Sequence, residues 1–127
     1  MLSIHNFAVE QLTKAMIGLK FLQGSADEII RTQSFKKYYP HGTGHFLGMD
    51  VHDAGEYKQN GDWRLLQSGM ALTVEPGCYI RPADNVPEHF WNIGIRIEDD
   101  VIVTPTGHEL LTLAAPKTID EIEELMQ

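Results

Sequence analysis

Apolar side chains near the N-terminus recur at steps of three and four residues, the spacing of one face of an amphipathic helix. This pattern predicts a helix over residues 3–22, and its apolar positions are Ile4, Phe7, Ala8, Leu12, Ala15, Met16, Leu19 and Leu22. Gly24 then provides a C-terminal stop. Ser25 and Glu28 have the spacing of a capping box, so a second, short helix is predicted to run to about Gln33.

The pattern changes after Pro40. Because proline restricts the residue before it to extended conformations, the segment that follows is predicted to be strand or loop. Residues 53–69 are polar and contain several glycines, which predicts a loop. A hydrophobic strand follows over residues 70–74, and Pro76-Gly77 interrupts it.

A two-residue period marks the next segment. After a loop over residues 81–87, three isoleucines alternate with Gly94, Arg96 and Glu98, so Arg96 and Glu98 are predicted to share one strand face. Asp99-Asp100 is interpreted as a tight connection to a strand over residues 101–104.

The last part of the chain predicts two further elements. Residues 105–107 are interpreted as a turn before an apolar run over residues 110–113, which makes the strands an antiparallel meander. Thr118 and Glu121 repeat the capping-box spacing and open a short acidic helix. Helices first, strands afterwards and a closing helix predict an α+β fold rather than alternating βαβ units.

Composition narrows the functional classes. The 127 residues are 43% hydrophobic, which suits one domain that buries roughly two-thirds of the surface of its unfolded chain. A formal net charge of −8, with only ten Lys and Arg, argues against a nucleic-acid-binding surface. The single Cys78 excludes an internal disulfide and a cysteine zinc cluster. With no signal-peptide pattern and no apolar run long enough for a membrane span, we expect a cytoplasmic protein.

The densest candidate chemistry lies in the stretch from His41 to His52, where three of the six histidines fall within twelve residues and are interspersed with glycines. Glu75 and Glu98 follow on the predicted strands. An unpaired carboxylate such as Glu75 is unfavourable in an apolar strand, so it should face solvent or have a cation beside it. The combination of His45, Glu75 and Glu98 therefore suggests a metal site.

Each of these residues also has a structural interpretation. Glu75 could be a surface glutamate at a strand end, and Arg96 and Glu98 could be an ordinary ion pair on one strand face. The remaining histidines, His5, His89 and His108, are interpreted as structural residues. The glycines of the histidine stretch do not have the spacing of a nucleotide-binding loop, and no Gly-x-Ser-x-Gly nucleophile motif is present.

Three stretches carry a resemblance to a known family. They are His41-Gly-Thr-Gly-His45-Phe-Leu-Gly-Met-Asp-Val-His52-Asp53, Leu72-Thr-Val-Glu75-Pro-Gly and Gly94-Ile-Arg96-Ile-Glu98-Asp-Asp. With these motifs the chain resembles the C-terminal half of the catalytic domain of bacterial Xaa-Pro aminopeptidases, which belong to the pita-bread metallopeptidases. The resemblance covers nearly the whole chain and implies that residues 1–127 are a single partial domain, half of a pita-bread fold.

The resemblance also implies roles for individual residues. The family splits the bond between an N-terminal residue and a following proline at a centre of two divalent metal ions, commonly manganese. By position, His45, Glu75 and Glu98 would be metal ligands, and Glu75 would also handle the proton of the attacking water. His52 would contact the scissile carbonyl and His41 would line the substrate pocket. Arg96 would support this arrangement from beside Glu98.

The same resemblance predicts that this chain is inactive alone. The family's two metal-ligating aspartates come from an upstream hairpin, whereas the only aspartate before His41 is Asp27, in the predicted capping box. The expected partners are a peptide with proline at its second position and either a second copy of the chain or a separately encoded N-terminal half. A prolidase-type dipeptidase and a noncatalytic peptide-binding or protein-binding relative are the alternatives.

Overall fold

A computed structural model describes all 127 residues. The α-helices are α1 (Leu2–Gly18), α2 (Ala26–Thr32) and α3 (Ile119–Leu125), and two short 3₁₀ helices are η1 (Ser34–Lys37) and η2 (Glu88–Phe90). The strands are β1 (Lys58–Gln59), β2 (Asp62–Trp63), β3 (Ala71–Val74), β4 (Gly77–Tyr79), β5 (Gly94–Arg96), β6 (Asp99–Thr104) and β7 (Gly107–Leu110). All strand pairs are antiparallel, so the α+β class predicted from the sequence is confirmed.

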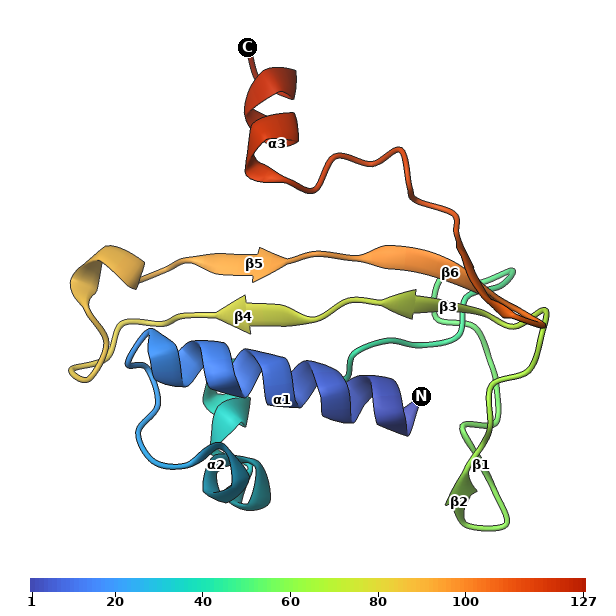
Figure 1. The fold of residues 1–127 in the computed structure, drawn as a ribbon, viewed down its shortest axis with the longest axis horizontal. Coiled ribbons are helices and arrows are strands. Elements are labelled where there is room, and N and C mark those ends of the chain that lie inside the picture. The colour runs from blue at the N-terminus through green and yellow to red at the C-terminus, as the bar shows by residue number, and fades with distance from the viewer.

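The strands form two long arms. β3 continues into β4, β5 continues into β6, and the two arms run side by side in opposite directions (Figure 1). β6 also pairs with β7, which gives a three-stranded sheet in the order β3-β6-β7 and a two-stranded sheet of β4 and β5. α1 lies along the β3–β4 arm with α2 beside it, and α3 stands apart from both helices (Figure 1).

The hydrophobic core lies between the helices and the β4–β5 end of the arms. Its buried members come from α1, α2, η1 and the segments next to β4, and they are Val9, Met16, Phe21, Ile29, Phe35, Tyr38, Tyr39, Ile80 and Val86. Tyr38 and Tyr39 are almost fully buried and belong to this packing. The core therefore fixes the helices against β4 and leaves the junction between β3 and β4 at its border.

The first helix ends earlier than predicted. α1 stops at Gly18, and Lys20 adopts the left-handed conformation with φ of 64°. The Phe21 N–H then donates to the Met16 carbonyl at 2.9 Å, the pattern of a Schellman motif. This turn directs Phe21 into the core, so Gly24 does not stop the helix and that prediction is wrong.

The structure contains a hairpin within the segment predicted as a loop. β1 and β2 are joined by Asn60 and Gly61, which both have positive φ angles, as a two-residue type I′ turn requires. The Asn-Gly pair was the available sequence indication, but each strand has only two residues. No alternation is therefore long enough to reveal the strands.

The tight connection predicted at Asp99-Asp100 is also wrong, because both residues are paired in β6. The Asp99 carboxylate accepts a hydrogen bond from Thr112 at 2.6 Å and lies 3.0 Å from the Lys117 ammonium. The Thr112 hydrogen bond and then Lys117 hold the pKa of Asp99 below its usual range. These contacts stabilise the Asp99 carboxylate within β6, although the Asp-Asp pair is typical of a turn.

The apolar run over residues 110–113 is not the last strand, because β7 ends at Leu110 and residues 111–113 form a turn. The sequence also did not predict β4, which follows Pro76 directly. The two predicted helix caps are present. The Ser25 side chain caps α2 by accepting a hydrogen bond from the Glu28 N–H, and Thr118 with Glu121 forms a complete capping box at α3. The turn before β7 is also present. No helix is both long and apolar enough to cross a membrane.

Candidate metal centre

The histidine stretch runs as an extended segment along β3. The Glu75 N–H donates to the Thr43 carbonyl at 2.6 Å, and the Thr73 N–H donates to the His45 carbonyl at 2.9 Å. Gly44 makes this close approach possible, because a Cβ atom there would lie only 1.9 Å from the Thr73 carbonyl oxygen. This pairing brings His45 next to Glu75.

The junctions within the two strand arms bring the two glutamates together. β3 pairs with β6 and β4 pairs with β5 in one continuous register, which places Glu75 opposite Glu98 and Pro76 opposite Ile97. Like charges directly opposite each other on antiparallel strands are unfavourable. Glu75 is only 8% exposed, so water screens its charge poorly. The arrangement therefore favours a positive charge near the two carboxylates.

His45 completes a set of three possible metal ligands. Its Nδ1 lies 3.0 Å from the Phe46 carbonyl, which can only accept, so Nδ1 donates and the neutral ring has its lone pair on Nε2. Nε2 lies 3.2 Å from Glu75 Oε1. Two lone pairs at this distance need a proton or a cation between them. His45, Glu75 and Glu98 each offer a ligand atom, and these atoms all lie within 4.8 Å of one another.

Arg96 is the positive side chain beside this cluster. Its Nη1 lies 3.4 Å from Glu75 Oε2, and its Nε donates to the Tyr79 hydroxyl at 2.8 Å. This hydrogen bond, followed by the nearby Tyr79, Glu75 and Glu98, raises the pKa of Arg96. Arg96 therefore stays charged and faces the carboxylate oxygen of Glu75 that is turned away from His45.

A chain of hydrogen bonds connects Arg96 with His41. The Tyr79 hydroxyl lies 2.8 Å from His41 Nε2, and His41 Nδ1 lies 2.7 Å from the Gly42 carbonyl. Because that carbonyl accepts from Nδ1, Tyr79 donates to Nε2 while its oxygen accepts from Arg96. Sequence reasoning missed Tyr79. Its position four residues after Glu75, on the same face of an extended chain, was the available indication.

His52 lies against the same cluster. The centroids of the His45 and His52 rings are 4.4 Å apart, and the two rings meet edge to face. His52 is exposed, so one side of its imidazole faces solvent. The structure thus brings together the predicted residues His45, His52, Glu75 and Glu98 with Arg96, and links His41 to them through Tyr79.

His5 has a different environment from the histidines of the cluster. Its Nδ1 lies 2.9 Å from the hydroxyl of the buried Thr43, which also contacts the Tyr39 hydroxyl at 2.5 Å. Burial, followed by Lys36 and His41, lowers the pKa of His5. Burial likewise raises the pKa of Tyr39. This group ties α1 to the back of the histidine stretch and lies outside the ligand cluster.

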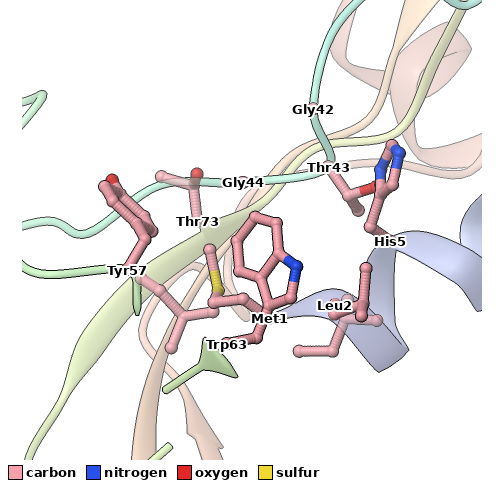
Figure 2. Close-up of a pocket in the computed structure, with 11 residues that line it drawn as sticks. Met1, Leu2, His5, Gly42, Thr43, Gly44, Tyr57, Trp63 and Thr73 are labelled. Atoms are coloured by element: carbon pink, nitrogen blue, oxygen red, sulfur yellow. The ribbon is translucent and has the colours of Figure 1, made fainter. Parts of the chain in front are cut away.

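A pocket of about 420 Å³ lies behind the same stretch (Figure 2). The first residues of α1, the segment around Thr43 and Gly44, and the β1–β2 hairpin enclose it, with Met1 and Trp63 pointing inward. Most of its surface is apolar, and none of the three candidate metal ligands lines it. The pocket therefore does not contain the candidate metal ligands, although Thr73, whose hydroxyl contacts Glu75, is part of its wall.

Comparison with known proteins places this geometry in a family. The profile of metallopeptidase family M24 matches residues 1–105. The Xaa-Pro aminopeptidase of Haemophilus influenzae is 46% identical over 114 residues, which are 90% of this chain and 26% of that protein. The chain thus spans about a quarter of the length of this relative.

Solved structures of aminopeptidases also match this chain. The aminopeptidase PepP of Pseudomonas aeruginosa matches with a TM-score of 0.92 and 50% identity over 96% of this chain and 28% of its own. Aminopeptidase P from E. coli, solved with the inhibitor Pro-Leu, matches with a TM-score of 0.86 and 47% identity, over 93% of this chain and 27% of its own.

Proposed function

The chain belongs to metallopeptidase family M24, and on this premise we propose that it forms the metal-binding C-terminal half of the catalytic domain of an Xaa-Pro aminopeptidase. The fold is that of part of aminopeptidase P, a pita-bread protein. The observation that carries the proposal is the convergence of His45, Glu75 and Glu98 within 4.8 Å. Two facing carboxylates and an imidazole form a donor set that a divalent cation would bind.

The donor set of this cluster fits divalent metal ions. Two carboxylates and one imidazole nitrogen are available from the three residues, and an oxygen-rich set of this kind suits manganese. We propose that His45, Glu75 and Glu98 would be the residues of this chain that hold the metal ions. When bound, such ions supply Lewis acidity that makes water a nucleophile near neutral pH.

The protein side chains then have distinct tasks. Glu75 accepts the proton of the attacking water, because its carboxylate is buried and points to the centre of the cluster. His52, exposed beside His45, donates a hydrogen bond to the scissile carbonyl as negative charge develops there. A donor in that position contributes on the order of 3 kcal/mol to lowering the barrier.

Arg96 and His41 orient these groups and the substrate. Arg96 holds Glu75 through the oxygen that faces away from His45, so the other oxygen stays turned toward the ligand cluster. Tyr79 fixes the His41 ring between Arg96 and the backbone, which leaves this ring at the edge of the site as part of the substrate pocket. The first task rests on the ion pair of Arg96 with Glu75, and the second on the hydrogen bonds of the His41 ring.

The proposed substrate is a peptide with proline at its second position. Support comes from the names of the relatives and from the aminopeptidase P structure that contains the inhibitor Pro-Leu. A prolidase-type dipeptidase would use the same metal cluster and differ in preferring dipeptides. Comparing cleavage of an Xaa-Pro dipeptide with that of a longer Xaa-Pro peptide, by an assembly that contains this half, distinguishes the two activities.

Residues 1–127 are proposed to be inactive on their own. The cluster offers three ligand residues, whereas two metal ions need more donors than these residues supply. We propose that the remaining ligands come from outside residues 1–127, from the N-terminal half of the catalytic domain. The three-residue set also supports a second candidate function, noncatalytic binding of peptides or proteins.

We further propose a cytoplasmic location, since the lone Cys78 is compatible with a reducing compartment.

The test is a calorimetric titration of the purified chain with Mn²⁺, with hydrolysis of an Xaa-Pro peptide assayed in the same samples. We expect binding by the wild type and its loss in both His45→Ala and Glu98→Ala. His89→Ala is the matched control, because His89 lies outside the cluster, and it should bind like the wild type.

Two results would contradict these proposals. Undiminished Mn²⁺ binding by both cluster variants would mean that His45 and Glu98 are not ligands. Peptide hydrolysis by the chain alone would show that three ligand residues suffice for activity.

A further inference from the structure

We propose that Thr73 is a positioning residue that sets the geometry of the pair His45 and Glu75. This inference rests on the proposed function, because it gives Thr73 a task in the same metal cluster. Thr73 offers no metal ligand in the cluster itself and is only 2% exposed, so it acts through its two neighbours.

The single hydroxyl of Thr73 serves both neighbours at once. It donates to Glu75 Oε1 at 3.0 Å and accepts from the backbone N–H of His45 at 3.0 Å. Glu75 Oε1 is also the oxygen that lies 3.2 Å from His45 Nε2. One buried hydroxyl therefore links the backbone of one ligand to the carboxylate of the other, at the atom where the two ligands meet.

The strand geometry explains why position 73 is suited to this task. Residues two apart on a strand share a face, so the Thr73 hydroxyl lies beside the Glu75 side chain. On the side of β3 that does not pair with β6, the Thr73 N–H also donates to the His45 carbonyl. His45 is thus held through both its N–H and its carbonyl by a single residue.

The orientation of Glu75 depends on this contact. Arg96 holds Oε2, but its side chain is 46% exposed and lies 3.4 Å away, so it restrains the carboxylate weakly. The Thr73 hydrogen bond is shorter and buried. Without the Thr73 hydroxyl, the Glu75 carboxylate can rotate away from His45. The partly buried N–H of His45 then also loses its hydrogen-bond acceptor.

Two substitutions distinguish a hydrogen-bonding role of Thr73 from a role in packing alone. Thr73→Val keeps the branched shape and removes the hydroxyl, whereas Thr73→Ser keeps the hydroxyl and removes a methyl group. Thr13→Val is the matched control, because Thr13 is also fully buried and its hydroxyl has no hydrogen-bond partner. If packing matters, the serine variant should be the more damaged. If the hydroxyl matters, the valine variant should be.

The experiment measures two properties of each variant of the full chain. The first is the amide hydrogen-exchange rate of His45 without added metal, compared with amides in the β6–β7 pair, which contains neither substituted residue. The second is the affinity for Mn²⁺ by calorimetry. In Thr73→Val we expect faster exchange at His45 alone and an affinity lower by about tenfold or more, as is typical when a hydrogen-bond partner of a metal ligand is removed. Thr73→Ser and Thr13→Val should resemble the wild type in both measurements.

The outcomes separate this inference from the proposed function. Wild-type exchange at His45 in Thr73→Val, or a serine variant as impaired as the valine variant, would overturn the role of Thr73. A wild-type chain that binds no Mn²⁺ would overturn the metal proposal. The exchange data on the metal-free chain would in that case still decide whether the Thr73 hydroxyl fixes His45.

Discussion

Single residues determine how closely the histidine stretch approaches β3, and Gly44 is the most restrictive of them. A Cβ atom at this position would lie 1.9 Å from the Thr73 carbonyl oxygen, which is backbone and cannot rotate away. Any side chain at position 44 therefore has to separate the stretch from β3, and with it His45 from Glu75.

We expect Gly44→Ala to lower the free energy of unfolding by about 1–3 kcal/mol, the usual range for an overpacked position, and to weaken Mn²⁺ binding. Urea unfolding and calorimetric titration measure the two effects. Gly42→Ala is the matched control, because a Cβ atom there has no other atom within 4 Å. Equal stability of the two variants would show that the stretch adapts to a side chain without strain.

Thr13, in contrast to Gly44, is a position where a substitution should stabilise the fold. Its Oγ1 is buried in α1 without a hydrogen-bond partner. Replacement by valine removes the unsatisfied hydroxyl and keeps the shape, so we expect Thr13→Val to raise the free energy of unfolding by about 1 kcal/mol. Denaturant unfolding measures it. Thr13→Ser, which keeps the hydroxyl and removes a methyl group, should be less stable than the wild type.

At the scale of elements, the capping motifs are where sequence and structure agree best. Ser25 and Thr118 were identified from spacing alone, and both cap their helices as predicted. A capping box joins residues three apart in the chain, so nothing distant has to be known. The errors fall where an element ends for tertiary reasons, as α1 does so that Phe21 can enter the core.

The capping box of α3 leads to a pH prediction. Hydrogen bonds from the Thr118 N–H, the Lys117 N–H and the Thr118 hydroxyl lower the pKa of Glu121 to about 2, from the usual 4.5. Because the folded-state pKa is depressed, the contribution of this carboxylate to helix stability is complete above pH 4.5 and is lost as the pH falls toward 2. Carboxyl chemical shifts followed by NMR should show Glu121 titrating near 2.

The Thr118→Val variant tests the origin of this shift. It removes the hydroxyl and keeps the two backbone donors, so the Glu121 pKa should rise only part of the way toward its usual value. A Glu121 titration midpoint near 4.5 in the wild-type chain would show that the capping box does not form in solution.

For the whole molecule, the main feature is apolar surface at the free edge of β5. β5 pairs with β4 on one side, so its other edge is free. Ile95 in β5 and its flanking residues Ile93 and Ile97 are 57%, 39% and 48% exposed. A free edge with exposed apolar side chains favours pairing with another chain.

We therefore expect the isolated chain to self-associate through β5. Ile95→Glu should shift size-exclusion chromatography toward the monomer and reduce binding of a hydrophobic dye. Leu65→Glu is the control, because Leu65 is 84% exposed on a segment outside β5, and it should leave both measurements unchanged. A monomeric wild-type chain that binds no dye would show that this edge is protected in solution.

The sequence by itself determined the candidate site residues and part of the local structure of this protein. The His41–His52 stretch, Glu75 and Glu98 were singled out from residue type and context, and capping and periodicity located the helices and the strands β3, β5 and β6. These features depend on residues close together in the chain. Only the tertiary structure decided that Glu75 stands opposite Glu98, because this follows from a register continued across Pro76. The tertiary structure also revealed the roles of Tyr79 and Thr73, because their hydroxyls form hydrogen bonds with residues up to 38 positions away in the chain.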